Sequence, residues 1–207
     1  MDENKEKLSG SSPDAESIKD GIYPYDSLEK SVDVIIEHAG RLEKKVYSLL
    51  VLNKMGYLQD SAPEGKTLNM ADVINKVILS MQVVKQDINI TTVLKPVNFH
   101  GEEEPWRIVV ENLLDNAIRY AQSEIVITLN EDELEISNDG PLMTDERLKK
   151  LFRPYEKGTD GKFGLGLSIV YRVVTTYGYK VEAENTENGV LFRIRRLKSQ
   201  DRRMIKK

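Results

Sequence analysis

The sequence predicts an α+β fold: a two-layer α/β sandwich in which helices lie on one face of a mixed sheet, preceded by a long helix of a helical hairpin or coiled coil. Two patterns support this prediction, a heptad stripe over 28–58 and an irregular alternation of helical and short strand patterns over 66–196. The 207 residues are 40% hydrophobic and 31% charged, which allows one ordinary packed core and a smaller helical element.

The first sixty residues contain polar chain and then helices. Residues 1–12 are charged and then rich in Ser and Gly, which predicts disorder or a linker. Residues 13–20 are expected to end a first helix, and the following loop offers Asp26 or Ser27 as the N-cap of a second. Apolar residues of the second helix recur in steps of four and three, the spacing of a helix that packs on other helices: Leu28, Val32, Ile35, Ala39, Leu42, Val46 and Leu49.

The division of the chain follows from its breakers and its charge. Residues 13–60 form the predicted partial hairpin, and Pro and Gly within 61–65 predict a linker. Strands are expected near 66–68, 88–94, 97–99, 124–129, 133–138, 179–185 and 190–195, and helices near 70–83, 103–121, 144–151 and 164–177. Residues 197–207 are expected to be a frayed basic tail, with a docking surface as the alternative.

Composition excludes several classes of protein. The net charge of −4 gives no general attraction to nucleic acid, and none is expected as a partner. The absence of cysteine excludes disulfides, thiolate zinc sites and a cysteine nucleophile. No apolar run reaches the length of a membrane span and the polar start is not a signal peptide, so we expect a soluble chain.

The helix expected near 103–121 carries an unusual polar face. Asn112, Asn116 and Arg119 lie at i, i+4 and i+7 and share that face, with Tyr120 at its edge. Two carboxamides are costly to bury unpaired, an amide oxygen suits Mg²⁺, and a cation one turn further can meet phosphate charge. The alternative is the solvent side of an amphipathic helix.

Two further segments offer contacts for a nucleotide. Asn138, Asp139 and Gly140 end a predicted strand, where an Asx oxygen can accept a hydrogen bond from an exocyclic amine such as that of adenine, although the same residues are ordinary turn formers. A glycine-rich loop flanked by Lys157 and Lys162 then leads into a helix, an arrangement that presents N–H groups to phosphate: Gly158, Gly161, Gly164 and Gly166. This loop matches neither a Walker A motif nor a dinucleotide fingerprint, and a flexible linker is its alternative.

In this order the segments resemble the N, G1, F and G2 boxes of the histidine-kinase ATPase domain, a Bergerat-type fold shared with gyrase, MutL and the ninety-kilodalton heat-shock chaperone. Residues 151–155 fit the F box, and the resemblance covers about 66–196. The short lid over 156–163 is similar to the kinase branch. The gyrase branch places a general-base Glu where this chain has Asn112, and Glu111 is one position away.

The resemblance implies ATP and Mg²⁺ as cofactors. By resemblance, Asn116 ligates the metal and Asn112 supports it, while Arg119, Tyr120 and Lys157 line the phosphate path. The remaining implied ATP-binding residues are those of the two glycine-containing segments: Asn138, Asp139, Gly140, Gly158, Gly164, Leu165, Gly166 and Leu167. The family usually has Asp where this chain has Asn138, and Leu142 replaces the second Gly of that box. A charged acceptor is typically worth about 1 kcal/mol more than a neutral one, so we expect weakened nucleotide binding.

No residue is identified as catalytic. Residues 14–58 resemble the end of helix one, the loop and helix two of the family's dimerisation-and-phosphotransfer hairpin, whose phosphoacceptor histidine lies on helix one. The two histidines do not fit that role: His38 lies in the second helix, where Ala39 and Glu43 replace the usual acid and proline, and His100 lies in a predicted loop. We expect a truncated hairpin and a chain that binds Mg–ATP without phosphorylating itself.

The implied function is the cytoplasmic ATP-binding portion of a two-component sensor histidine kinase, an enzyme that transfers the γ-phosphoryl group to a histidine and onward to an Asp of a response-regulator receiver domain. The parent protein is expected to be membrane-anchored, and the chain to form a homodimer through 28–58. The alternative is a nucleotide-sensing dimeric interaction module without phosphotransfer. A third hypothesis is a serine kinase of the anti-sigma type, and the segment that resembles helix two argues against it.

Overall fold

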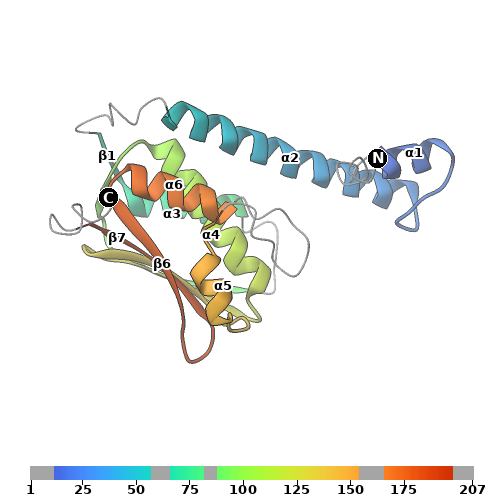
Figure 1. Ribbon diagram of the computed structural model, residues 1–207. Helices are drawn as coiled ribbons and strands as arrows, with labels where there is room; N and C mark the ends of the chain where they lie inside the picture. Colours follow the sequence, from blue (N-terminus) through green and yellow to red (C-terminus); the bar gives the residue numbers. More distant parts are fainter. Residues whose placement is uncertain (1–11, 57–65, 82–87, 154–165, 198–207) are drawn as a thin grey trace. The chain divides into compact units, whose positions relative to one another are not determined.

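The computed structural model describes residues 12–56, 66–81, 88–153 and 166–197 (Figure 1). The chain divides into two compact units, 1–51 and 52–207. The expected disorder over 1–12 and the expected tail over 197–207 lie outside the described residues except for Ser12, which begins a helix, and Leu197, and the linker 61–65 lies outside them entirely. No helix in the described ranges has the length and apolar character needed to cross a bilayer.

The helices of the first unit are joined by a defined turn. Helix α1 (Ser12–Lys19) ends where Gly21 takes a φ of 79° and the Ile22 N–H donates to the Ser17 carbonyl at 2.8 Å, a glycine-terminated helix end. Helix α2 (Leu28–Gly56) begins after Ser27, whose Oγ accepts a hydrogen bond from the Lys30 N–H at 3.2 Å. Of the two N-cap candidates, Ser27 therefore caps the helix.

The apolar stripe of α2 is largely exposed. Five of its residues are 38–62% exposed, from Val32 at 38% to Leu42 at 62% with Leu28, Val46 and Leu49 between them, whereas Ile35 is only partly exposed. An apolar stripe of coiled-coil spacing gains stability only when another helix covers it. The stripe is thus available to a partner helix.

The second unit is built on a five-stranded sheet with strand order β2-β4-β5-β7-β6. The strands are β2 (Asn89–Leu94), β4 (Glu124–Leu129), β5 (Glu133–Asn138), β6 (Tyr179–Asn185) and β7 (Val190–Arg196). Strands β2 and β4 are parallel and the other neighbours are antiparallel, which confirms the predicted mixed sheet. A separate antiparallel pair joins β1 (Thr67–Asn69) to β3 (Asn98–His100).

Helices α3 (Met70–Met81), α4 (Glu103–Tyr120) and α6 (Gly166–Thr176) cover one face of the sheet, and α5 (Asp145–Lys150) follows β5 (Figure 1). Every second residue of the central strands points into the core, as Leu134 and Ile136 of β5 do with 1% and 0% exposed. Trp106 is fully buried, and its Nε1 donates to the His100 carbonyl at 2.8 Å. The predicted two-layer sandwich is confirmed.

The opposite face of the sheet carries a charged network. Arg193 of β7 lies opposite Glu135 of β5 and contacts Glu135, Glu133 and Glu184 at 2.7, 3.2 and 3.1 Å. A sheet that is apolar on one face and charged on the other is typical of antiparallel strands with one face in water. The core, and with it any buried binding site, therefore lies on the helical side.

Candidate nucleotide-binding site

The polar face of α4 meets the start of α6. The Asn112 Nδ2 donates to the Ile108 carbonyl at 2.7 Å, which orients the side-chain amide. A Cβ atom at Gly166 would lie 2.5 Å from the Asn112 Oδ1, so the backbone of α6 passes close to this oxygen and glycine leaves the room for it. The structure thus brings together the amide face and the end of the glycine-rich loop, two features the sequence offered separately.

Asn116 and Arg119 lie one and two turns further along α4. The Asn116 Nδ2 is buried without a hydrogen-bond partner, an arrangement that costs about 1–3 kcal/mol unless a ligand satisfies it. Arg119 is held by Asp115 at 2.7 Å in a largely solvated pair. Because such pairs are worth roughly 0–1 kcal/mol, Arg119 can exchange Asp115 for a phosphate at little cost.

Tyr120 is held between two other elements. Gly140 packs so closely on it that a Cβ atom there would lie 2.2 Å from the Tyr120 carbonyl oxygen. On its other side, Arg147 of α5 donates to the Tyr120 hydroxyl at 3.3 Å, and its guanidinium carbon lies 5.5 Å from the ring centroid, a cation–π contact. Arg147 was not a sequence candidate, since a lone basic residue in a short helix gives no signal of a contact with α4.

Asn138, at the end of β5, presents an unused acceptor. Its side chain is 8% exposed, its Nδ2 donates to the Ala117 carbonyl at 3.3 Å, and its Oδ1 is buried without a partner. The exocyclic amine of adenine would satisfy this oxygen. The Asn138 amide can donate to the Ala117 carbonyl, whereas a carboxylate at this position would face that carbonyl as a second acceptor.

The Asp139 carboxylate holds a neighbouring loop in place. Its carboxylate accepts hydrogen bonds from the Gln122 N–H at 2.8 Å, the Ser123 N–H at 2.9 Å and the Ser123 hydroxyl at 2.6 Å. The Ser123 hydroxyl is the main reason why the pKa of Asp139 lies well below its usual range. Asp139 anchors the loop between α4 and β4, and this stabilisation is lost progressively as the pH falls through the ordinary range of a carboxyl group and below it.

The other predicted residues divide between described and undescribed chain. Lys157, Gly158, Gly164 and Leu165 lie outside the described residues, and Gly166 and Leu167 open α6. The F-box residue Phe152 is described: its ring centroid lies 6.1 Å from that of Tyr171 and 6.5 Å from that of Phe192. These contacts hold the start of the F box to α6 and the sheet.

Glu111 and His100 could each have taken part in catalysis, but both side chains contact an arginine. Arg107 is bonded to both Glu104 and Glu111, and the bond to Glu104 is the main reason why the pKa of Arg107 is raised. Glu111 is therefore an ion-pair partner and not a free base for activating water. His100 lies at the end of β3, where its Nε2 is 2.5 Å from the Arg196 guanidinium.

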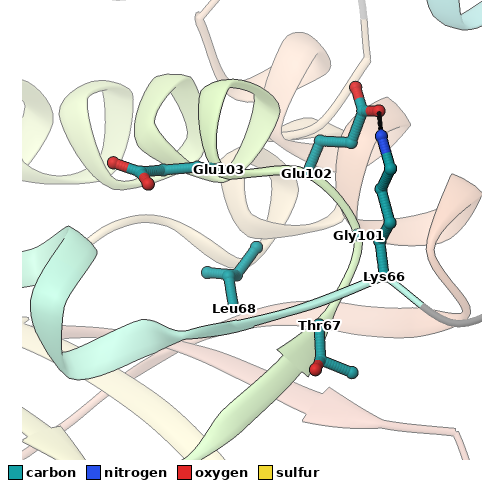
Figure 2. A pocket seen from close by; sticks show the side chains of 6 residues that line it. All are labelled: Lys66, Thr67, Leu68, Gly101, Glu102 and Glu103. Atoms are coloured by element: carbon teal, nitrogen blue, oxygen red, sulfur yellow. Dashed lines mark hydrogen bonds and ion pairs between the residues drawn. The ribbon is translucent and has the colours of Figure 1, made fainter.

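A hollow elsewhere on the second unit is lined by Lys66, Thr67, Leu68, Gly101, Glu102 and Glu103 (Figure 2). The Lys66 ammonium lies 2.8 Å from the Glu102 carboxylate within it. Gly101 has a φ of 125°, and a Cβ atom there would lie 2.8 Å from the Trp106 Nε1. The hollow lies at β1 and the first residue of α4, whereas Asn112 and Asn116 lie more than two turns further along α4 and Asn138 ends β5.

Comparison with known proteins agrees with this geometry. Residues 101–201 match the family described as histidine kinase-, DNA gyrase B-, and HSP90-like ATPase. Over 184 residues the chain is 38% identical to the sensor histidine kinase CssS of Bacillus subtilis strain 168, an alignment that covers 86% of the chain. The chain carries a histidine-kinase ATPase domain.

The chain aligns with part of the length of its relatives. The sensor protein QseC of Escherichia coli K12 is 32% identical over 164 residues, which cover 74% of this chain. The solved catalytic domain of histidine kinase ThkA, in a nucleotide-free form, is 28% identical with a TM-score of 0.54, over 62% of this chain and 92% of that one. The alignments span 41% of CssS and 35% of QseC, so the ATPase domain described here corresponds to a part of each relative.

Proposed function

We propose that this ATPase domain binds Mg²⁺–ATP between α4, the turn after β5 and the start of α6, and presents the γ-phosphoryl group to a histidine of a phosphoacceptor helix. The observation that carries the proposal is the unpaired, buried Asn138 Oδ1, an acceptor that the adenine amine would satisfy. Asn112, Asn116, Arg119 and Tyr120 extend from it along α4 toward the phosphates.

Each residue has a role that follows from its chemistry. Asn116 would hold Mg²⁺ through its amide oxygen while its Nδ2 donates to a phosphate oxygen, and Asn112 would support it. The metal, when bound, neutralises charge on the phosphates. Arg119, Lys157 and the N–H groups of Gly158 and of Gly164–Leu167 would bind the remaining phosphate oxygens. Asp139 and Gly140 keep the base-binding turn in place.

The reaction needs positioning more than covalent help from the protein. The imidazole nitrogen of the acceptor histidine forms a bond to the γ-phosphorus while the bond to the bridging oxygen breaks, and ADP leaves. The acceptor is a histidine other than His38 and His100. His38 lies in α2, the helix that resembles helix two and not helix one, and His100 lies beside Arg196. A receiver-domain Asp of a response regulator then takes the phosphoryl group.

In this proposal, the first unit mediates dimerisation. The exposed stripe of α2 pairs with the same stripe of a second copy, which makes a homodimer. Because ATP is the phosphoryl donor and the relatives are sensors, the domain works in the cytoplasm as a portion of a membrane-anchored protein.

Trans-phosphorylation tests the proposed function. The chain, labelled ATP and the isolated phosphoacceptor hairpin of a related kinase are mixed, and acid-labile phosphate is measured on each protein. Label is expected on the hairpin histidine and not on this chain. Nucleotide binding without transfer would instead favour a nucleotide-sensing module, and acid-labile phosphate on His38 or His100 would contradict the assignment of the acceptor.

Asn116→Ala tests the metal site. With Mg²⁺ present, the affinity for ATP is expected to fall about tenfold, equivalent to about 1.4 kcal/mol, because the amide ligand is lost. Without Mg²⁺, the change is expected to be much smaller. Titration calorimetry of both proteins in magnesium and in chelator measures the two differences, with Asn75→Ala on the exposed side of α3 as control. Equal losses in the two buffers would remove Asn116 from the metal site.

A further inference from the structure

The segment from Asn138 to Met143, here called the acceptor turn, is fastened at successive positions. Asp139 holds the backbone of Gln122 and Ser123, and Gly140 packs on the Tyr120 carbonyl. The Asn138 Nδ2 is bonded to the Ala117 carbonyl, while its Oδ1 has no partner. The acceptor turn therefore offers one unused buried acceptor on an otherwise restrained segment.

The far end of the acceptor turn is held by Asn185, the last residue of β6. The Met143 N–H donates to the Asn185 Oδ1 at 2.9 Å, and the Asn185 Nδ2 donates to the Met143 carbonyl at 2.7 Å. The side-chain amide thus satisfies both backbone groups of Met143, as a neighbouring strand would. This contact joins residues that are far apart in the chain.

The same hairpin also supports the near end of the acceptor turn. In the sheet register, Val190 lies opposite both Asn138 and Asn185. Gly189, beside Val190, packs so closely that a Cβ atom there would lie 1.8 Å from the Asn138 carbonyl oxygen. The β6–β7 hairpin therefore contacts both ends of the acceptor turn.

Base recognition by an asparagine depends on such restraint. An amide presents an acceptor on one side and a donor on the other, and rotation about its terminal bond exchanges the two. With Oδ1 facing the base, the site accepts the 6-amino group of adenine. With Nδ2 facing it, the site would instead bind the 6-oxo group of hypoxanthine or guanine. A carboxylate would not have this ambiguity.

We propose that Asn185 is a positioning residue that sets the preference for adenine, by holding the acceptor turn so that Asn138 keeps its Oδ1 toward the base. The inference rests on the proposed nucleotide site. Asn185 acts on the base through Met143 and the acceptor turn. Its loss frees the turn, weakens the contact of Asn138 with Ala117 and lets the amide present either side.

The test compares ATP with ITP, which differ at the 6-position of the base by this donor and acceptor. Titration calorimetry measures both dissociation constants for the full chain and for Asn185→Ala. The unmodified chain is expected to bind ATP at least about tenfold more tightly than ITP, and Asn185→Ala to narrow this ratio to about twofold. Asn188→Ala, an exposed asparagine of the same hairpin, is the matched control and should keep the full ratio.

Further outcomes separate the possible failures. Asn185→Asp keeps the acceptor for the Met143 N–H and loses the donor, so an intermediate ratio is expected; it also supplies the measurement if the alanine variant unfolds. An unchanged ratio in a folded Asn185 variant, with both affinities reduced equally, would overturn the positioning role. If the unmodified chain binds neither nucleotide, the proposed function itself fails.

Discussion

Gly189→Ala is expected to lower the free energy of unfolding of the ATPase domain by about 3 kcal/mol, the upper end of the usual cost of overpacking. The added Cβ would lie 1.8 Å from the Asn138 carbonyl oxygen, 2.8 Å from its carbonyl carbon and 3.0 Å from the Asp139 Cα. All three are backbone atoms, so no side-chain rotation relieves the overlap. Either the hairpin or the end of β5 must move, and that displaces the acceptor turn as well.

Thermal unfolding followed by tryptophan fluorescence measures this loss. The chain has a single tryptophan, Trp106, which is fully buried in the ATPase domain and so reports on that unit. At about 2–4 °C per kcal/mol, the midpoint is expected to fall by roughly 6–12 °C. Gly40→Ala is the control, since a Cβ there meets no atom within 4 Å and the glycine lies inside helix α2. A Gly189→Ala midpoint equal to that of the control would contradict the close approach.

Asn138→Leu is expected to reduce ATP affinity by roughly 10- to 150-fold, about 1.4–3 kcal/mol. The leucine has a similar branched shape but leaves the adenine amine facing an apolar group in a buried site. The domain should remain folded, because the change removes a 3.3 Å bond to the Ala117 carbonyl together with an acceptor that had no partner. Binding and unfolding measured on the same preparation separate these effects.

Asn138→Asp provides the informative comparison. Its carboxylate would accept from adenine with a full charge but could not donate to Ala117, so the preference for ATP over ITP should persist while stability declines. If Asn138→Leu binds ATP as tightly as the unmodified chain, the base is recognised elsewhere and the central observation of the proposed function is lost.

Much of the fold followed from local pattern. The strands over 124–129 and 133–138 and the long helix α4 lie where alternation and helical spacing placed them. The shared face of Asn112, Asn116 and Arg119 is also local, because the helical repeat alone brings residues three and four apart to one side. The resemblance added the order of the boxes and the expected ligand.

Asn138 and Asp139 are neighbours whose different surroundings the local sequence pattern did not predict. Both were candidates for contact with ATP, and both are acceptors in a turn. On a strand, adjacent side chains point to opposite faces, and here the sheet buries Asn138 while Asp139 meets the backbone of Gln122 and Ser123. Because residues 122 and 123, which lie earlier in the chain, satisfy Asp139, the acceptor that stays unused is Asn138.

The sequence by itself determined the helices and strands and the polar face of α4, because these depend on the spacing of neighbouring residues, and the order of its short motifs gave the resemblance that implies the ligand. Only the tertiary structure decided the contacts of Tyr120 with Arg147, Met143 with Asn185 and Gly189 with Asn138. Each joins segments that are distant in the chain. Such contacts depend on sheet register and helix packing, which no local spacing specifies.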